Sequence, residues 1–191
     1  MTKSELRKAY LERRRSLSPN DHSALSSKIV DRLFAEIDFG AINVLHCYIS
    51  LKHFGEVETR ILFSRVWSTL PRIITTAPRI DDATNSVDSL IYQHDTPVNE
   101  NRWRIPEPEG SEIIAPESLD LVIVPLLCFD RLGHRVGYGK GFYDRILQKC
   151  RPDCIKAGLS FFPPVDMIDD VHEADIPLDL CVTQTDTFRF S

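Results

Sequence analysis

Apolar residues recur along the first part of the chain at helical spacing. Leu6, Tyr10 and Leu17 fall on one stripe of a predicted helix over residues 3–17. Ser18 followed by Pro19 is typical of a helix start, and a second apolar series then predicts a helix that runs to about residue 38. That series consists of Leu25, Ile29, Leu33 and Ile37.

Short apolar runs rich in β-branched and aromatic residues predict strands farther along the chain. The clearest is Leu121–Val124, which ends at Pro125 because proline has no N–H to donate within a central strand. One helical pattern begins near Ile61, and another begins at Phe142. The remaining predicted strands cover residues 42–49, 72–76, 90–92, 155–159 and 180–183.

Alternating strands and helices predict an α/β fold. We expect a single three-layer α/β/α domain over residues 1–191, with a mainly parallel sheet covered on both faces. Residues 1–38 are expected to pack on this domain as N-terminal helices. A chain of 191 residues with 42% hydrophobic residues is long enough to bury about 70% of its unfolded surface.

The composition is typical of a reduced intracellular protein. The five cysteines include no C-x-x-C pair, so neither a zinc site nor a redox motif is indicated. The first residues form a charged helical pattern rather than an apolar signal region, and no run approaches about 18 apolar residues. We therefore expect a cytoplasmic protein with free thiols and no membrane partner.

The net charge of −5 conceals a basic N-terminal segment. Residues 1–15 carry six cations against two carboxylates, an asymmetry that often indicates nucleic-acid binding. The segment is short, however, has Tyr10 as its one aromatic residue, and belongs to no nucleic-acid-binding module. We therefore expect a small polyanion rather than nucleic acid as the ligand. A monomer is expected as well.

The stretch between Pro125 and Phe142 has the composition of an anion-binding loop. Its glycines permit positive φ and close approach of the backbone to a ligand, and two cations lie among them. A helix follows, and the free N–H groups and dipole of a helix N-terminus favour phosphate. The glycines are Gly133, Gly137, Gly139 and Gly141, and the cations are Arg135 and Lys140.

Two common phosphate-binding motifs do not fit this loop. A Walker motif requires a glycine where His134 stands and a serine or threonine where Gly141 stands. The dinucleotide fingerprint requires its third glycine at the position of Phe142. Its acidic ribose partner would follow about 20 residues later, where Phe162 and Pro163 lie.

A third pattern, R-x-G-x-G-x-G-[FY]-Y-D, fits the loop at every constrained position. With it the chain resembles the 5-formyltetrahydrofolate cyclo-ligases, also called methenyltetrahydrofolate synthetases. The alternative interpretation is a glycine-rich turn whose cations are merely solvated. The matching residues are Arg135, Gly137, Gly139, Gly141, Phe142, Tyr143 and Asp144.

The resemblance implies a role for each part of the loop. Arg135, Lys140 and the glycine N–H groups would hold the polyphosphate of ATP, and Asp144 would bind Mg²⁺. Tyr143 would pack against the reacting atoms or donate a hydrogen bond near them. The resemblance also places Tyr138 and Phe142 at the folate substrate, and implies an architecture similar to the coenzyme A transferase superfamily.

Two weaker motifs extend the resemblance toward the N-terminus. Lys3 and Arg7 match a K-x-x-x-R segment that contributes to the ATP site, although an amphipathic helix with solvated charges would look the same. Glu56 begins an E-V-E-T run, and the resemblance assigns it to the folate. Its alternative role is to complement the dipole of the helix that follows.

Two further segments are assigned by resemblance. Trp103 belongs to a W-x-I-P-x-P stretch near the folate pocket, or else anchors a proline-rich loop. Residues 160–180 contain six acidic residues and no Lys or Arg, which suits a divalent ion as well as solvent. Asp175 lies where the family has its second Mg²⁺ ligand, and Asp170 is the alternative for this role.

The implied reaction is the ATP-dependent cyclisation of 5-formyltetrahydrofolate to 5,10-methenyltetrahydrofolate, with release of ADP and phosphate. ATP and Mg²⁺ are the implied cofactors, and a reduced folate is the small-molecule substrate. The alternative is a folate- or nucleotide-binding module that has lost turnover. Tyr138 keeps this alternative open, because an arginine at its position would add a phosphate contact that tyrosine cannot supply.

Overall fold

The computed structural model describes residues 1–81, 86–110 and 112–190. Four α-helices and three short 3-10 helices lie within these residues. The α-helices are α1 (Lys3–Arg15), α2 (Pro19–Glu36), α3 (Thr59–Thr69) and α4 (Phe142–Leu147). The 3-10 helices are η1 (Phe39–Ala41), η2 (Lys52–Phe54) and η3 (Pro116–Ser118).

Eight strands of the described chain form the central sheet, and two small hairpins lie beside it. Five neighbouring strands run parallel to one another. The strands added at both ends of this group pair antiparallel with their neighbours. In spatial order the sheet contains β12 (Thr187–Arg189), β11 (Leu180–Val182), β10 (Ile155–Leu159), β7 (Leu121–Val124), β1 (Val44–Cys47), β2 (Ile74–Asp81), β3 (Ser86–Ile91) and β6 (Ile113–Ile114). The hairpins pair β4 (Val98–Glu100) with β5 (Pro106–Pro108), and β8 (Cys128–Phe129) with β9 (Arg135–Val136).

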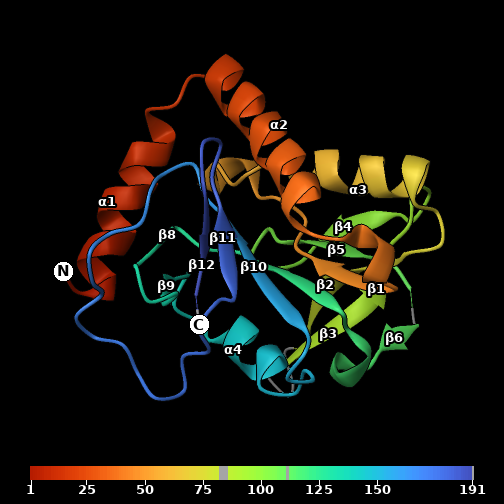
Figure 1. Cartoon of the computed structure of the whole chain (residues 1–191). Coiled ribbons are helices and arrows are strands. Elements are labelled where there is room, and N and C mark those ends of the chain that lie inside the picture. The colour runs from red at the N-terminus through yellow and green to blue at the C-terminus, as the bar shows by residue number, and fades with distance from the viewer. Residues whose placement is uncertain (82–85, 111, 191) are drawn as a thin grey trace.

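Alternate residues of the central strands point into two different cores. On β7, Leu121 and Ile123 belong to the core under α2 and α3, while Val122 and Val124 belong to the core under α4. Figure 1 shows α2 and α3 on one side of the sheet and α4 on the other. The alternation explains why the central strands are apolar throughout, because both of their faces are buried. The predicted α/β fold with a mainly parallel sheet is confirmed.

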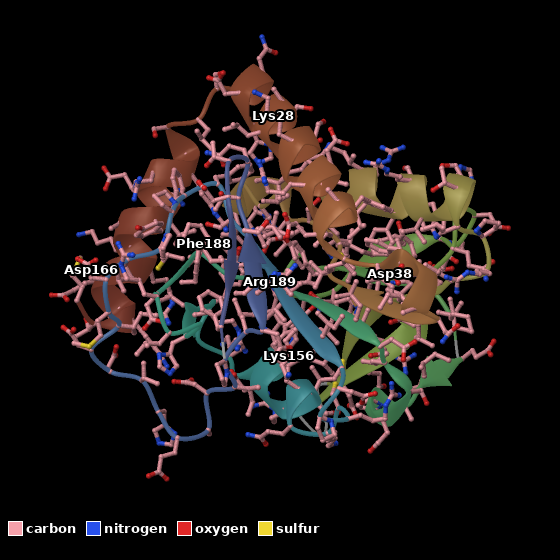
Figure 2. All side chains as sticks on the ribbon, in the orientation of Figure 1. Lys28, Asp38, Lys156, Asp166, Phe188 and Arg189 are labelled. Atoms are coloured by element: carbon pink, nitrogen blue, oxygen red, sulfur yellow. The ribbon has the colours of Figure 1, made fainter. Side chains whose placement is uncertain are left out.

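Side chains fill the space between the sheet and the helices (Figure 2). α1 is placed differently from α2, because it packs on the β8–β9 hairpin rather than on the sheet. Leu6 and Tyr10 form a third core with Leu127, Cys128 and Val136. The segment after β10 runs beside the start of α1, where the Asp169 N–H donates to the carbonyl of Met1 at 3.1 Å.

Several predicted boundaries are wrong. The predicted helix over residues 3–17 ends at Arg15, and the predicted strand over residues 42–49 is confined to β1. β2 and β3 extend well beyond the apolar runs at 72–76 and 90–92, because cross-strand polar pairs continue the ladder. One such pair is Arg79 with Asp88, whose charged groups are 3.0 Å apart. The edge strands β6 and β12, and the hairpin inside the predicted glycine loop, were not predicted.

Two further expectations concern the cysteines and the helices of the chain. All five cysteines lie within the described residues and are free thiols. Within the same residues, no helix combines the length and the apolar character needed to cross a membrane.

Candidate active site

The site lies where two neighbouring parallel strands, β1 and β7, end. The chain leaves β1 through α3 to β2 on one side, and leaves β7 through α4 to β10 on the other side. These opposite crossovers put α3 and α4 on opposite faces and leave a crevice at the carboxyl ends of the two strands. Such a topological switch point is where open α/β sheets bind ligands.

A cavity of about 660 Å³ occupies this crevice. All of the site residues predicted from the sequence line it, although they come from five separate parts of the chain. From the N-terminus they are Lys3, Arg7, Glu56, Trp103, Arg135, Gly137, Tyr138, Gly139, Lys140, Gly141, Phe142, Tyr143, Asp144 and Asp175.

The glycine segment is shaped by the hairpin before it and by α1 beside it. Arg7 donates from Nε to the carbonyl of Gly137 at 2.9 Å, which ties the loop to α1. Gly139 has φ +86°, and a Cβ there would lie 3.3 Å from Nη2 of Arg7. Gly141 has φ +63° and precedes α4. These two positions require glycine, because side chains rarely adopt such φ values.

The cations of the site differ in how they are held. Arg135 lies on β9 and is 8% exposed, and its guanidinium is 2.6 Å from the Asp144 carboxylate. Lys3 forms an ion pair with Asp175. Lys140 is exposed, and its ammonium has no ion-pair partner among the described residues. The cavity therefore has both balanced charges and a cation available for an anionic ligand.

Asp144 and Asp175 line the same cavity from α4 and from the acidic segment. Asp144 also accepts from the Ile176 N–H at 3.2 Å, which holds the two elements together. Burial acts to raise the pKa of Asp175, but the hydrogen bond from Lys3 and the His172 N–H hold that pKa below its usual range. Asp170 is not among the lining residues and instead accepts from the Lys3 N–H at 2.6 Å.

This donor set fits Mg²⁺. The ion is usually held by one or two carboxylates together with water and substrate phosphates, rather than by a cage of protein ligands. Asp144 and Asp175 supply two carboxylates beside the glycine loop. In the described part of the chain, no three His, Cys, Asp or Glu side chains gather into a metal-binding group.

Glu56 is a buried carboxylate of the lining, and it is 4% exposed. Its Oε2 accepts from the Leu51 N–H at 2.7 Å, and its Oε1 accepts from the Tyr138 hydroxyl at 2.5 Å. Burial raises the pKa of Glu56, while these two hydrogen bonds and the charge of Arg14 act to lower it. Glu56 lies two residues before Glu58, the N-cap residue of α3, and both of its oxygens accept hydrogen bonds from groups outside that helix.

Apolar side chains complete the cavity around Glu56. Trp103 lies 6.5 Å from Phe142 between ring centroids, and Phe54 stacks on Tyr138 at 4.7 Å. Trp103 is 36% exposed, so it is a wall of the cavity rather than the anchor of a buried loop. The other apolar lining residues are Ile49, Leu51, Pro78, Ile80, Val87, Ile105 and Pro125.

The Tyr143 hydroxyl contacts His46, a residue that the sequence did not point to. The Tyr143 hydroxyl is 3.4 Å from Nε2 of His46, and Nδ1 of His46 lies 3.1 Å from Thr76 Oγ1 and 3.0 Å from Ser89 Oγ. Burial lowers the pKa of His46 to about 3, so the imidazole is neutral. A histidine inside an apolar strand carries no sequence signal for this contact.

Most of the cavity-lining residues that were not predicted also lack a sequence signal. Ile80 and Val87 come from the polar extensions of β2 and β3, and Phe54 comes from η2. Each is an ordinary apolar residue in its own segment, and only the sheet order brings it to the cavity. Tyr48 and Ile49 could have been found, because residues directly after a parallel strand lie at the ligand-binding edge.

Comparisons with known proteins agree with this geometry. The chain matches the model of the 5-formyltetrahydrofolate cyclo-ligase family over residues 1–184. It is 27% identical over 188 residues to 5-formyltetrahydrofolate cyclo-ligase of Escherichia coli (strain K12), covering 94% of this chain and 98% of that protein.

Two solved structures of 5,10-methenyltetrahydrofolate synthetases are also similar. The Aquifex aeolicus protein has a TM-score of 0.77 and 30% identity, covering 99% of this chain and 93% of that chain. The Mycoplasma pneumoniae protein has a TM-score of 0.76 and 25% identity, covering 96% of this chain and 99% of that chain.

Proposed function

Because the chain belongs to the 5-formyltetrahydrofolate cyclo-ligase family, we propose that it converts 5-formyltetrahydrofolate and ATP to 5,10-methenyltetrahydrofolate, ADP and phosphate. The observation that carries the proposal is one cavity of about 660 Å³ that has two chemically different parts. One part has glycines and cations suited to a polyphosphate. The other has a buried carboxylate among aromatic and aliphatic side chains, suited to a pterin.

The reaction must overcome a poor leaving group. The formyl oxygen attacks the γ-phosphorus of ATP, ADP departs, and the oxygen becomes part of a phosphate ester. N10 then attacks the formyl carbon, loses its proton, and the oxygen leaves as inorganic phosphate. In this scheme the protein supplies mainly position and charge neutralisation, as is usual for phosphoryl transfer.

Cations and backbone groups would hold the polyphosphate. Arg135 and Lys140 supply positive charge, and the N–H groups of the glycine segment approach a ligand closely because no side chains intervene. Lys3 and Arg7 would close this side from α1. When bound, Mg²⁺ would neutralise phosphate charge, and Asp144 and Asp175 are the residues that would hold it.

Glu56 would orient the folate. A carboxylate accepts paired hydrogen bonds from the N–H donors of a pterin ring, and both of its oxygens are already fixed by protein donors. Phe142 and Trp103 would flank the ring. Tyr143, held by His46, would contact the reacting formyl group.

The activity is tested by following methenyl product spectrophotometrically with 5-formyltetrahydrofolate, ATP and Mg²⁺. We expect product that depends on all three additions, and less of it from Glu56→Gln at fixed folate concentration. Binding of both ligands without any product would favour the alternative, a binding module without turnover. Failure to bind folate would remove the proposed function altogether.

Asp144→Asn tests the metal assignment. The change keeps the size of the side chain but removes an anionic oxygen ligand, so turnover should fall by orders of magnitude and recover partly at high Mg²⁺. Asp170→Asn is the matched control, because Asp170 lies outside the cavity lining, and it should keep the wild-type Mg²⁺ dependence. An Asp144→Asn enzyme with wild-type activity and Mg²⁺ dependence would contradict the assignment.

The remaining expectations stay predictions. We propose a cytoplasmic monomer that binds neither nucleic acid nor membranes.

A further inference from the structure

Arg14 is a buried cation that the proposed reaction does not use directly. It is 3% exposed, although its neighbours Arg13 and Arg15 on α1 are exposed. Its guanidinium donates from Nη1 to the Tyr138 hydroxyl at 3.2 Å and from Nη2 to the carbonyl of Leu126. Because arginine is rarely fully buried without a paired group, this burial calls for a specific role.

The hydrogen bonds that begin at Arg14 have a defined direction. A guanidinium only donates, so the Tyr138 oxygen accepts from Arg14 and its single proton is free for Glu56 Oε1 at 2.5 Å. The Leu51 N–H fixes the other carboxylate oxygen at 2.7 Å. The Tyr138 ring is itself held by stacking on Phe54, at an interplanar angle of 26°.

We propose that Arg14 is a positioning residue for folate recognition, acting through the Tyr138 hydroxyl to orient the Glu56 carboxylate toward the cavity as a charged acceptor. Arg14 does not line the cavity, whereas Tyr138 and Glu56 do. The inference rests on the proposed function, because it takes Glu56 as the acceptor for the folate N–H groups.

The charges around Glu56 support this role. Burial raises the pKa of Glu56 and would favour its neutral form, while the charge of Arg14 acts in the opposite direction. The other titratable groups that face the carboxylate come from β1 and its end, from the glycine segment and from α4. They are Cys47, Tyr48, Tyr138 and Tyr143, and burial raises the pKa of each, so they are neutral at pH 7.

The first experiment compares 5-formyltetrahydrofolate binding to wild type and Arg14→Met by calorimetry over a range of pH. We expect roughly 10- to 100-fold weaker binding at neutral pH, the loss typical of a missing charge-assisted hydrogen bond. Without the cation the pKa of Glu56 rises further. As the pH is lowered, folate affinity should therefore begin to fall at a higher pH in Arg14→Met than in wild type. Titrations of the folate itself are common to both proteins and cancel in the comparison.

Matched variants separate this role from general stability. Arg13→Met removes an exposed cation that stacks on Phe162, 4.2 Å from the ring centroid, and should bind folate like wild type. Arg14→Lys should recover part of the affinity because it keeps the charge. Tyr138→Phe breaks the same chain while keeping the ring, so it should reproduce the pH shift even if Arg14→Met folds poorly.

A double-mutant cycle with Glu56→Gln decides the matter. If Arg14 acts through Glu56, adding Arg14→Met to Glu56→Gln should cause little further loss of folate affinity. The inference would be overturned if Arg14→Met caused an equal loss of folate affinity in wild type and in Glu56→Gln. It would also be overturned if the pH at which folate affinity falls were the same in Arg14→Met and Tyr138→Phe as in wild type. A wild-type protein that binds no folate would instead overturn the proposed function.

Discussion

Individual residues of the site are paired with one another in the free protein. Arg135 contacts Asp144, and Lys3 contacts Asp175. When MgATP binds, the metal ion would replace each cation at its carboxylate, and phosphates would replace each carboxylate at its cation. The Lys3–Asp175 pair, whose side chains are 18% and 23% exposed, can exchange partners at modest cost because its charges remain partly solvated. Lys140 is different, because its charge is available before any ligand binds.

Lys140→Ala should therefore raise the KM for ATP roughly 10- to 100-fold, because a point charge that contacts phosphate cannot be replaced by backbone donors. Steady-state kinetics with folate saturating provide the measurement. Lys149→Ala, an exposed lysine after α4, is the control and should match wild type. An unchanged KM for ATP with a collapse of folate affinity would mean that the loop serves the other substrate.

At the scale of elements, the β8–β9 hairpin and α1 together shape the part of the cavity that holds the glycine segment. The Leu127 N–H donates to the carbonyl of Val136 at 2.7 Å, which closes the hairpin just before the glycines. Leu6 and Tyr10 bury the adjoining face of α1. The same helix carries Lys3 and Arg7, which line the cavity, and Arg14, which bonds to the Tyr138 hydroxyl beside Glu56, so in the proposed function one element would serve both ligands.

Gly139→Ala tests this junction. At φ +86° a side chain costs about 1–2 kcal/mol of stability, and the new Cβ would also crowd Arg7. We expect a lower melting temperature and a higher KM for ATP. Gly137→Ala is the structural control, since its Cβ would meet just the Pro125 carbonyl at 4.0 Å, and its melting temperature should match wild type. Equal melting temperatures for both variants would show that the strained φ is not required.

For the molecule as a whole, His46 joins the sheet to the active site. It is fully buried on β1 and contacts Thr76 on β2, Ser89 on β3 and Tyr143 on α4. Its folded-state pKa of about 3 lies below the value of about 6.5 expected in the unfolded chain. Between these values the unfolded state binds more protons, so stability is fully present above about pH 6.5 and is lost as the pH falls toward 3.

His46→Gln should flatten this acid dependence. The slope of the unfolding free energy between roughly pH 6 and pH 4 should fall by about 1.4 kcal/mol per pH unit, the contribution of one proton. Urea unfolding at several pH values measures it, whatever the stability of the variant at neutral pH. His94→Gln, at an exposed position, controls for the loss of a histidine as such. Parallel slopes for wild type and His46→Gln would refute the assignment.

Local pattern determined a large part of the fold, and motif resemblance identified the candidate site residues. Strands β7 and β10 and the start of the helix at Phe142 have the bounds predicted from apolar runs and the glycine segment. The predicted site residues all line the cavity, and they were identified by the resemblance of their motifs to the family pattern although they come from five separate parts of the chain. Such residues can be recognised without knowing their partners.

Tertiary structure decided which distant residues meet. Periodicity reports which face of its own element a side chain occupies, but not which strands become neighbours. The adjacency of β1 and β7 creates the crevice, and the contacts of Tyr138 with Arg14 and Glu56 join residues 124 and 82 positions apart. The small edge strands escaped prediction because they are only two and three residues long and their pairing is set by the neighbouring strand. The sequence therefore determined the chemical groups of this site, and the order of strands in the sheet decided how those groups support one another.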